Sequence, residues 1–236
     1  MIRPHGFVLM YGDRQDLHRK LLNGLVMAGM DKLPFLFWMN TVCPESQALV
    51  RSHPAPWRSI ESKENVPKYI AMGRMFAEAR EYPGWDWIFW YDDDVSITRP
   101  DYLVQWTRSI DSGAMVCAGQ RRDLRFRQWP GMLGFIKTAA WYRGRPFGKP
   151  PGGRGVGVPF ARGWHWVLRR DLAEGLSWPD PRLTHNRGDV LLGAAVYQAG
   201  YKVHDYSYGI QLNEKRRRGM CQPPPLELYK DKDGVC

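Results

Sequence analysis

Three consecutive carboxylates, Asp92, Asp93 and Asp94, follow directly on the mainly aromatic and apolar run 85–91. The bulky residues of this run predict a buried strand, so the acidic cluster is expected where that strand ends. Clustered carboxylates repel one another and resist the loss of water, and a divalent cation is the usual remedy. Mg²⁺ and Mn²⁺ prefer oxygen ligands and often bridge a carboxylate to a substrate diphosphate. The cluster therefore indicates either a metal–diphosphate site or, as the alternative, a solvated acidic turn.

A second group of chemically versatile residues is the basic segment 120–157, in which arginines alternate with aromatic residues. Such a composition suits a nucleic acid, because guanidinium groups bind phosphates and aromatic rings stack on bases. It equally suits a carbohydrate, since aromatic rings also stack on sugars. The whole chain has 34 Lys and Arg against 24 Asp and Glu, a formal charge of +10. This excess favours polyanionic partners, unless it serves solubility alone.

The elements that must position these residues follow from the hydrophobic patterns. The first half of the chain alternates apolar runs typical of strands with apolar residues at helical spacing. This β-α-β alternation indicates an α/β layered domain. Asp13 is a candidate cap for the first helix, and 120–157 is expected to be a long functional loop with some embedded structure. The expected strands are 6–11, 33–39, 87–91, 114–118 and 201–204, with regular structure also at 163–168, and the expected helices are 17–30, 44–50, 67–79, 100–110, 170–176 and 189–199.

Length and composition limit the class of protein. A chain of 236 residues with 44% hydrophobic residues suits one α/β domain with a real core. The four cysteines, Cys43, Cys117, Cys221 and Cys236, show neither a Cys-x-x-Cys pair nor metal-ligand spacing, which predicts reduced thiols. Because the sequence shows no signal-peptide pattern and no apolar stretch of transmembrane length, we expect a cytoplasmic protein without membrane insertion.

Several motifs stand in a particular order along the chain. An α/β half comes first, the strand that ends in the three aspartates follows, and 187–193 (Arg-Gly-Asp-Val-Leu-Leu-Gly) leads into 199–203 (Ala-Gly-Tyr-Lys-Val). This order resembles that of GT-A-type glycosyltransferases, enzymes that use nucleotide sugars and have an Asp-x-Asp signature. The resemblance spans most of residues 6–210. It implies a single GT-A-like (Rossmann-like) α/β domain, with a central mixed, mostly parallel sheet flanked by helices.

The resemblance also implies a donor site that holds Mn²⁺ or Mg²⁺ and a nucleotide sugar, with a UDP-sugar favoured. In such enzymes the strand-end acids hold the metal against the donor diphosphate, which makes Asp94 the direct metal ligand. Asp92 would bind the metal through a water molecule or bind the donor ribose. His204 would complete the metal site, with His165 and His185 as weaker rivals. Further expected donor contacts are Tyr11, Gly12, Lys68, Arg74 and, with the least defined role, Asp93.

On the acceptor side, 160–172 resembles a Gly-containing strand of the family that passes beneath the sugar. Asp189 would be the general base that takes the acceptor proton, and the alternative role is that of a helix N-terminal acid that stabilises the macrodipole. Gly188 occupies the position of a first acidic residue in many members, so Asp189 is the only carboxylate of this motif. The stretch 65–72 resembles another family motif near the donor, with Pro67 in place of the usual Gly. The expected acceptor contacts are Arg162, Gly163, Trp164 and His165.

The chain is accordingly divided within one glycosyltransferase domain, 1–236. We expect a nucleotide-sugar-binding half at 6–118 and an acceptor-binding half at 119–210, which includes the basic loop 120–157. The polar residues 211–236 form a C-terminal tail.

The resulting hypothesis is a metal-dependent glycosyltransferase that transfers a sugar to a hydroxyl acceptor. The positive charge favours a hydroxylated base in DNA, as in some bacteriophage enzymes, with base flipping needed for a duplex. Such an enzyme would work in the cytoplasm of a host cell. A cell-surface or lipid-linked glycan is the alternative acceptor. Two other classes stay open: a non-enzymatic nucleic-acid-binding protein with structural acids, and a metal-dependent nucleotidyltransferase or nuclease.

Overall fold

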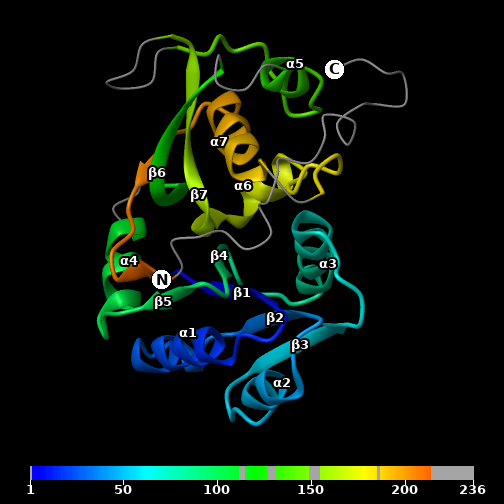
Figure 1. The fold of residues 1–236 in the computed structure, drawn as a ribbon. Coiled ribbons are helices and arrows are strands. Elements are labelled where there is room, and N and C mark those ends of the chain that lie inside the picture. Colours follow the sequence, from blue (N-terminus) through cyan, green and yellow to red (C-terminus); the bar gives the residue numbers. More distant parts are fainter. Residues whose placement is uncertain (1, 112–114, 127–130, 149–154, 185–186, 214–236) are drawn as a thin grey trace.

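A seven-stranded sheet forms the centre of the molecule (Figure 1). The computed structural model describes residues 2–111, 115–126, 131–148, 155–184 and 187–213. The strands lie in the order β3-β2-β1-β4-β7-β6-β8, and β7 runs antiparallel to both of its neighbours. The strands are β1 (Pro4–Tyr11), β2 (Phe35–Asn40), β3 (Trp57–Ser62), β4 (Trp87–Asp92), β6 (Cys117–Arg125), β7 (Gly157–Arg169) and β8 (Val203–Asp205), and a separate ribbon pairs β5 (Val95–Ile97) with β9 (Ile210–Leu212).

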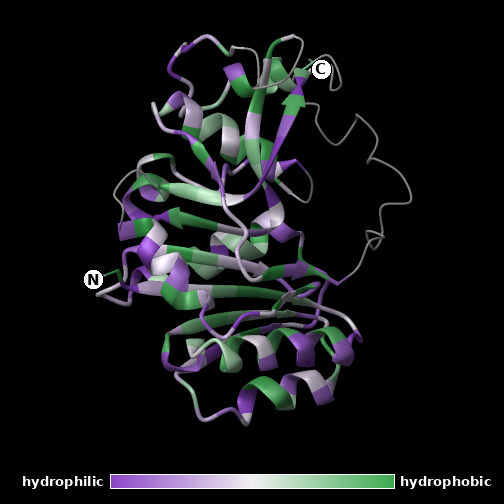
Figure 2. Ribbon diagram, turned by 90° about the vertical axis from the view of Figure 1, so that its left-hand side faces the viewer, coloured by the Kyte–Doolittle hydropathy of each residue, from purple (hydrophilic) through white to green (hydrophobic). Residues whose placement is uncertain are grey.

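Helices cover both faces of this sheet. On one face α3 (Lys68–Arg80) and α7 (Gly188–Gln198) join apolar side chains of the strands in one core cluster. On the other face α1 (Gln15–Met27), α2 (Pro44–Arg51) and α4 (Tyr102–Asp111) form a second cluster. Figure 2 shows the lower helix pair alternating between hydrophilic purple and hydrophobic green, as amphipathic helices on a sheet should. The remaining helices are η1 (Met30–Lys32), α5 (Met132–Lys137) and α6 (Arg170–Gly175).

The strand β4 shows why the aromatic run becomes the centre of the fold. Ile88 and Trp90 belong to one core cluster and Phe89 and Tyr91 to the other, because successive side chains of a strand point to opposite faces. β1 and β7 flank β4, so its edges are covered as well as its faces. The predicted buried strand is confirmed, and it ends at Asp92.

The α/β class with a mixed, mostly parallel sheet is confirmed. Three strands were not predicted, namely β3, β5 and β9. β5 and β9 have three residues each, and the side chains of β3 and β9 are only partly buried, so they give weak hydrophobic patterns. The predicted cap at Asp13 is wrong, because Arg14 occupies the N-cap of α1 without a side-chain capping bond. Among the described residues, no helix has both the length and the apolar character needed to cross a lipid bilayer.

The basic segment 120–157 contains more regular structure than predicted. β6 starts at Cys117 and continues to Arg125, and its outer half pairs with the first residues of β7. Polar side chains dominate this outer half of β6, so the sequence shows no apolar alternation there. α5 follows further along the segment. The segment thus begins with a strand that pairs antiparallel with β7 and extends the sheet.

Candidate functional site

The acidic motif lies at the carboxyl edge of the sheet, where parallel β1 and β4 both end. Ligand sites of open α/β sheets lie at this edge. Three further elements reach the same place. α3 begins there with Lys68, β7 passes with Gly163, and α7 begins there with Gly188 and Asp189. The folded chain therefore brings together residues as far apart in sequence as Lys68 and Asp189.

Asp92 is held by two donors. Lys68 Nζ donates to its carboxylate oxygens at 2.5 and 2.7 Å, and Trp90 Nε1 donates at 2.9 Å. The same Nζ donates to the carbonyl oxygen of Gly163 at 2.8 Å. Trp90 in turn stacks on Trp166 with the ring centroids 5.8 Å apart. Lys68 is only 9% exposed, and its ammonium group is paired with the carboxylate of Asp92.

The side chain of Asp93 points to the opposite face of the sheet from that of Asp92, into the protein. Its Oδ2 accepts the backbone N–H of Tyr11 at 2.8 Å and lies 3.0 Å from His18 Nε2. The other ring nitrogen of His18 lies 2.8 Å from Ser46 Oγ. Because an ionised carboxylate only accepts, Nε2 is the donor toward Asp93, and a neutral His18 then accepts from Ser46. These contacts tie the end of β4 to α1 and α2, and donor binding by Asp93 stays a prediction.

Asp94 begins the turn between β4 and β5. Its carbonyl oxygen accepts the N–H of Asn213 at 2.8 Å, and Ser96 Oγ donates to Asn213 Oδ1 at 3.2 Å. Asn213 Nδ2 is buried and has no hydrogen-bond partner among the described residues. Asn213 is thus a neighbour of the acidic motif that the sequence analysis missed. Only the non-local pairing of β5 with β9 places it there, and three-residue strands leave no readable pattern.

Gly163 separates Asp189 from Lys68. A Cβ atom at this position would lie 3.5 Å from Asp189 Cβ, 3.6 Å from Asp189 Oδ2 and 3.6 Å from Lys68 Nζ. The glycine therefore leaves a small space lined by a carboxylate and an ammonium. Asp189 lies in the first turn of α7, and its Oδ1 accepts the N–H of Val190 at 3.0 Å.

Tyr69 explains the glycine that precedes Asp189. A Cβ atom at Gly188 would lie 2.0 Å from the Tyr69 ring, so the buried tyrosine fills the space that a side chain would need. Burial and the nearby carboxylates of Asp189 and Asp92 raise the pKa of Tyr69 well above its usual range. A neutral phenol thus lies beside both acids. Tyr69 falls within the predicted helix 67–79, but no role at the site was predicted for it.

The predicted base and ribose contacts lie at the end of β1. Gly12 has a φ of +59°, and a Cβ atom there would meet no atom within 4 Å, so its surface is open. Burial, and then Asp92, raise the pKa of Tyr11 above its usual range. Asn40 connects this edge to the start of α3, because its side chain donates to the Val66 carbonyl oxygen at 2.8 Å and accepts the Val66 N–H at 2.8 Å.

The other predicted site residues that the structure describes lie on α3, β7 and β8. The Arg74 guanidinium carbon lies 5.8 Å from the Trp38 ring centroid. His165 is fully buried, with Nδ1 2.8 Å from the Trp90 carbonyl oxygen, and desolvation lowers its pKa to about 4. His204 lies on β8, which β6 and β7 separate from β4. Arg162 and Trp164 are partly exposed on β7, and His185 lies outside the described residues.

Within the described part of the chain, no group of three or more His, Cys, Asp or Glu side chains lies close enough to enclose a metal ion. The geometry explains this, because Asp92 and Asp93 point to opposite faces of β4. Mg²⁺-type sites, however, often use one or two carboxylates and complete their shell with water and substrate phosphates. The metal roles of Asp94 and Asp92 stay predictions. The metal role of His204 stays a prediction.

No protein-family model matches the sequence, and no curated protein sequence matches it. Solved structures do match the fold. The mannosyltransferase PcManGT from Pyrobaculum calidifontis, solved with GDP-Man and Mn²⁺, has a TM-score of 0.59 and 15% identity over 90% of this chain and 57% of that one. TarS 1–349 from S. aureus, solved with UDP-GlcNAc, has a TM-score of 0.65 and 12% identity over 97% of this chain and 64% of that one.

A third match is GalNAc-T7, solved with UDP, GalNAc and Mn²⁺, with a TM-score of 0.60 and 10% identity over 95% of this chain and 46% of that one. The present chain thus spans less than two thirds of each of these proteins. The likeness shows that the chain has the fold of GT-A-type glycosyltransferases.

Proposed function

We propose that the protein is a metal-dependent glycosyltransferase that moves a sugar from a nucleotide-sugar donor to a hydroxyl group. One observation supports this above all others. At the ligand-binding edge of a GT-A-type sheet, Asp92, Lys68 and Asp189 lie together around Gly163. A carboxylate for the metal, a cation for phosphate and a second carboxylate for the acceptor are the groups that this reaction needs.

On the donor side, Asp94 and Asp92 are the proposed metal ligands. The bound Mn²⁺ or Mg²⁺ would neutralise charge on the leaving diphosphate. Lys68, now held by Asp92 and Gly163, lies within reach of the same diphosphate and supplies a positive charge in a largely buried setting. Tyr11 and the open surface at Gly12 are the proposed contacts of the nucleoside.

On the acceptor side, Asp189 is the proposed general base. It would take the proton of the acceptor hydroxyl as the oxygen attacks the sugar, and the missing side chain of Gly163 leaves room for that oxygen. Tyr69 keeps its proton at neutral pH, because burial raises its pKa, and therefore adds no negative charge beside Asp189.

For the acceptor we favour a hydroxylated base in DNA. The net charge of +10 supports this choice. So does the outer part of the β6–β7 pair, where β6 presents Arg121, Arg122 and Arg125 next to β7, the strand that also contains Gly163. A cell-surface or lipid-linked glycan is the competing acceptor.

The donor half of the proposal is tested by thermal denaturation with UDP- and GDP-sugars, each with and without Mn²⁺. A ligand that binds only the native state raises the melting temperature. We expect a metal-dependent rise in the melting temperature with one nucleotide sugar. Asp94→Ala should abolish this rise. Asp111→Asn, the control, removes an exposed carboxylate at the end of α4 and should keep the rise. A rise that survives in Asp94→Ala, or no rise with any donor, would contradict the assignment.

The acceptor half is tested with the donor so identified. The protein is incubated with duplex DNA that contains hydroxymethylated pyrimidines and, separately, with a lipid-linked oligosaccharide. The masses of the products are then measured by mass spectrometry. The proposal expects one hexose or pentose added to the DNA and none to the glycan. Modification of the glycan alone would replace DNA as the acceptor while leaving the transferase assignment intact.

A further inference from the structure

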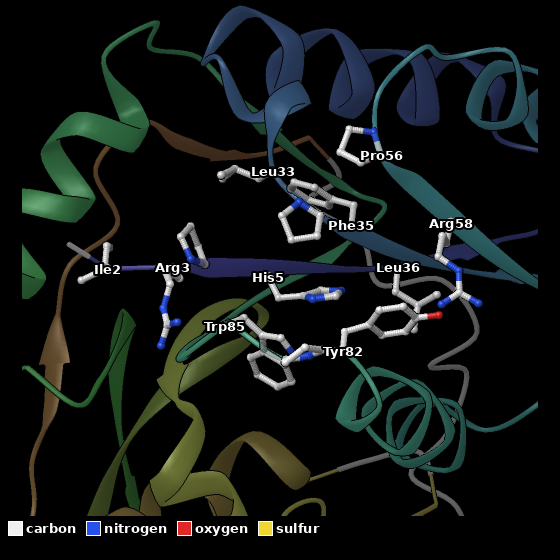
Figure 3. Close-up of a pocket in the computed structure, with 14 residues that line it drawn as sticks. Ile2, Arg3, His5, Leu33, Phe35, Leu36, Pro56, Arg58, Tyr82 and Trp85 are labelled. Carbon is white, nitrogen blue, oxygen red and sulfur yellow. The ribbon is translucent and has the colours of Figure 1, made fainter.

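We propose that the protein has a second ligand site at the opposite edge of the sheet, a cavity that binds a small aromatic anion. This site is independent of the proposed transferase reaction. The cavity has a volume of about 540 Å³ and lies at the amino ends of β1 and β2, where Leu36, Tyr82 and Trp85 form apolar walls (Figure 3). Ligand pockets typically measure about 300–1,000 Å³, so the cavity fits one molecule with one or two rings.

His5 forms the floor of this cavity. Its side chain lies between Leu36 and Trp85 in Figure 3, and the residue is only 5% exposed. Among the described residues, neither of its ring nitrogens has a hydrogen-bond partner. A buried polar group without a partner is costly, and most such groups in native proteins are satisfied by a neighbour, a water or a ligand. Both ring nitrogens are shielded from solvent, so His5 lines the cavity mainly with the carbon atoms of its ring.

Positive charge lies at both ends of the cavity. Figure 3 shows Arg3 and Arg58 on opposite sides of His5. Arg3 pairs with Asp86 at 3.5 Å and Arg58 with Glu78 at 2.8 Å, yet both guanidinium side chains stay at least half exposed. The lining itself contains no Asp or Glu in the described chain. Burial, and then the charges of Arg170 and Arg58, lower the pKa of His5 to about 4, so the ring is neutral at pH 7.

These features together select the ligand class. Apolar walls and aromatic rings favour a flat hydrophobic body, and the arginines favour a carboxylate, sulfonate or phosphate at its edge. His5 and Tyr11 stand six residues apart on β1, which places the two sites about 20 Å from each other. Occupancy of one site therefore leaves the other free.

The test uses 8-anilinonaphthalene-1-sulfonate, an aromatic monoanion that fluoresces in apolar surroundings, with the full chain. We expect saturable binding of one molecule per chain, with no displacement by the nucleotide and Mn²⁺ that occupy the donor site. Pro56→Trp, which adds an indole at an exposed position of the lining, should abolish binding. Arg58→Gln should weaken it about tenfold, whereas Arg19→Gln, the same change on the exposed face of α1, should have no effect.

A spectrum of the protein with ¹⁵N-labelled histidines locates the probe directly. One imidazole signal should shift on binding, and that signal should be missing in His5→Phe, a variant that keeps an aromatic ring at the position. Displacement of the probe by nucleotide, unchanged binding in Pro56→Trp and Arg58→Gln, or an unshifted His5 signal would each overturn the proposal. Because Arg58→Gln changes a side chain that is half exposed, the test does not depend on Pro56→Trp folding.

Discussion

At the scale of single residues, two glycines decide which side chains meet at the candidate active site. Gly163 leaves open space between Asp189 and Lys68, and a Cβ atom there would make ordinary contacts of 3.5–3.6 Å. Gly188 leaves none, because a Cβ atom would lie 2.0 Å from the ring of Tyr69. The first glycine therefore serves the site, and the second serves the packing of α7 on α3.

Alanine at these two positions should have opposite consequences. Gly188→Ala should lower the free energy of unfolding by about 1–3 kcal/mol through overpacking, and Tyr69→Leu should relieve part of this loss. Gly163→Ala should leave the unfolding free energy unchanged within about 0.5 kcal/mol but lower kcat, because its methyl group occupies the proposed acceptor space. Urea denaturation and steady-state kinetics separate the two. A Gly163→Ala enzyme with unchanged kcat would place the acceptor elsewhere.

At the scale of elements, the ribbon of β5 and β9 supports the acidic motif through Asn213. The N–H of Asn213 reaches the carbonyl oxygen of Asp94 only because β9 pairs with β5, with Gln211 opposite Ser96. The position of Asp94 therefore depends on a strand about 115 residues further along the chain.

Gln211→Pro tests this dependence, because proline removes the N–H of the central residue of β9. We expect the Mn²⁺ concentration for half-maximal activity to rise about tenfold or more. Since β9 is short and partly exposed, the melting temperature should fall only slightly. Gln211→Ala, which keeps the N–H, is the control and should resemble the unmodified protein. Equal metal dependence in both variants would show that β9 does not support the motif.

Elements with strong hydrophobic patterns were predictable, and those held by distant pairing were not. The run 87–91 is buried on both faces, and α7 is buried nearly all round, so their patterns were clear in the sequence. Asn213 and His18 reach the motif through β9 and α1, and no local pattern links them to it. The sequence also did not predict the contact between Lys68 and Asp92, although it predicted each residue as a donor contact.

At the scale of the whole molecule, two buried histidines make stability depend on pH. Burial lowers the pKa of both His5 and His165 to about 4, and charges on Arg170 and Arg58 add to the effect at His5. Below about pH 6.5 the unfolded chain binds two protons that the native protein excludes. The native state is therefore favoured most above this pH and loses stability as the pH falls toward 4.

Chemical denaturation between pH 8 and pH 4 should show this loss. Each histidine contributes on the order of 3 kcal/mol, and the loss should begin near pH 6.5. His5→Phe should remove about half of the pH dependence while raising the unfolding free energy at pH 5. A flat profile between pH 6.5 and pH 4.5 would mean that both rings take up protons in the native protein.

The stacked indoles of Trp90 and Trp166 lie directly under the charged pair of the candidate site. Their planes differ by 9°, the Trp90 ring centroid is 5.7 Å from Lys68 Nζ, and the Trp90 N–H bonds to Asp92. Two rigid chromophores at this spacing couple their electronic transitions, and a nearby charge shifts those transitions. The near-ultraviolet circular dichroism of the unlabelled protein therefore reports on the ammonium and carboxylate above the rings, so the site contains its own optical probe.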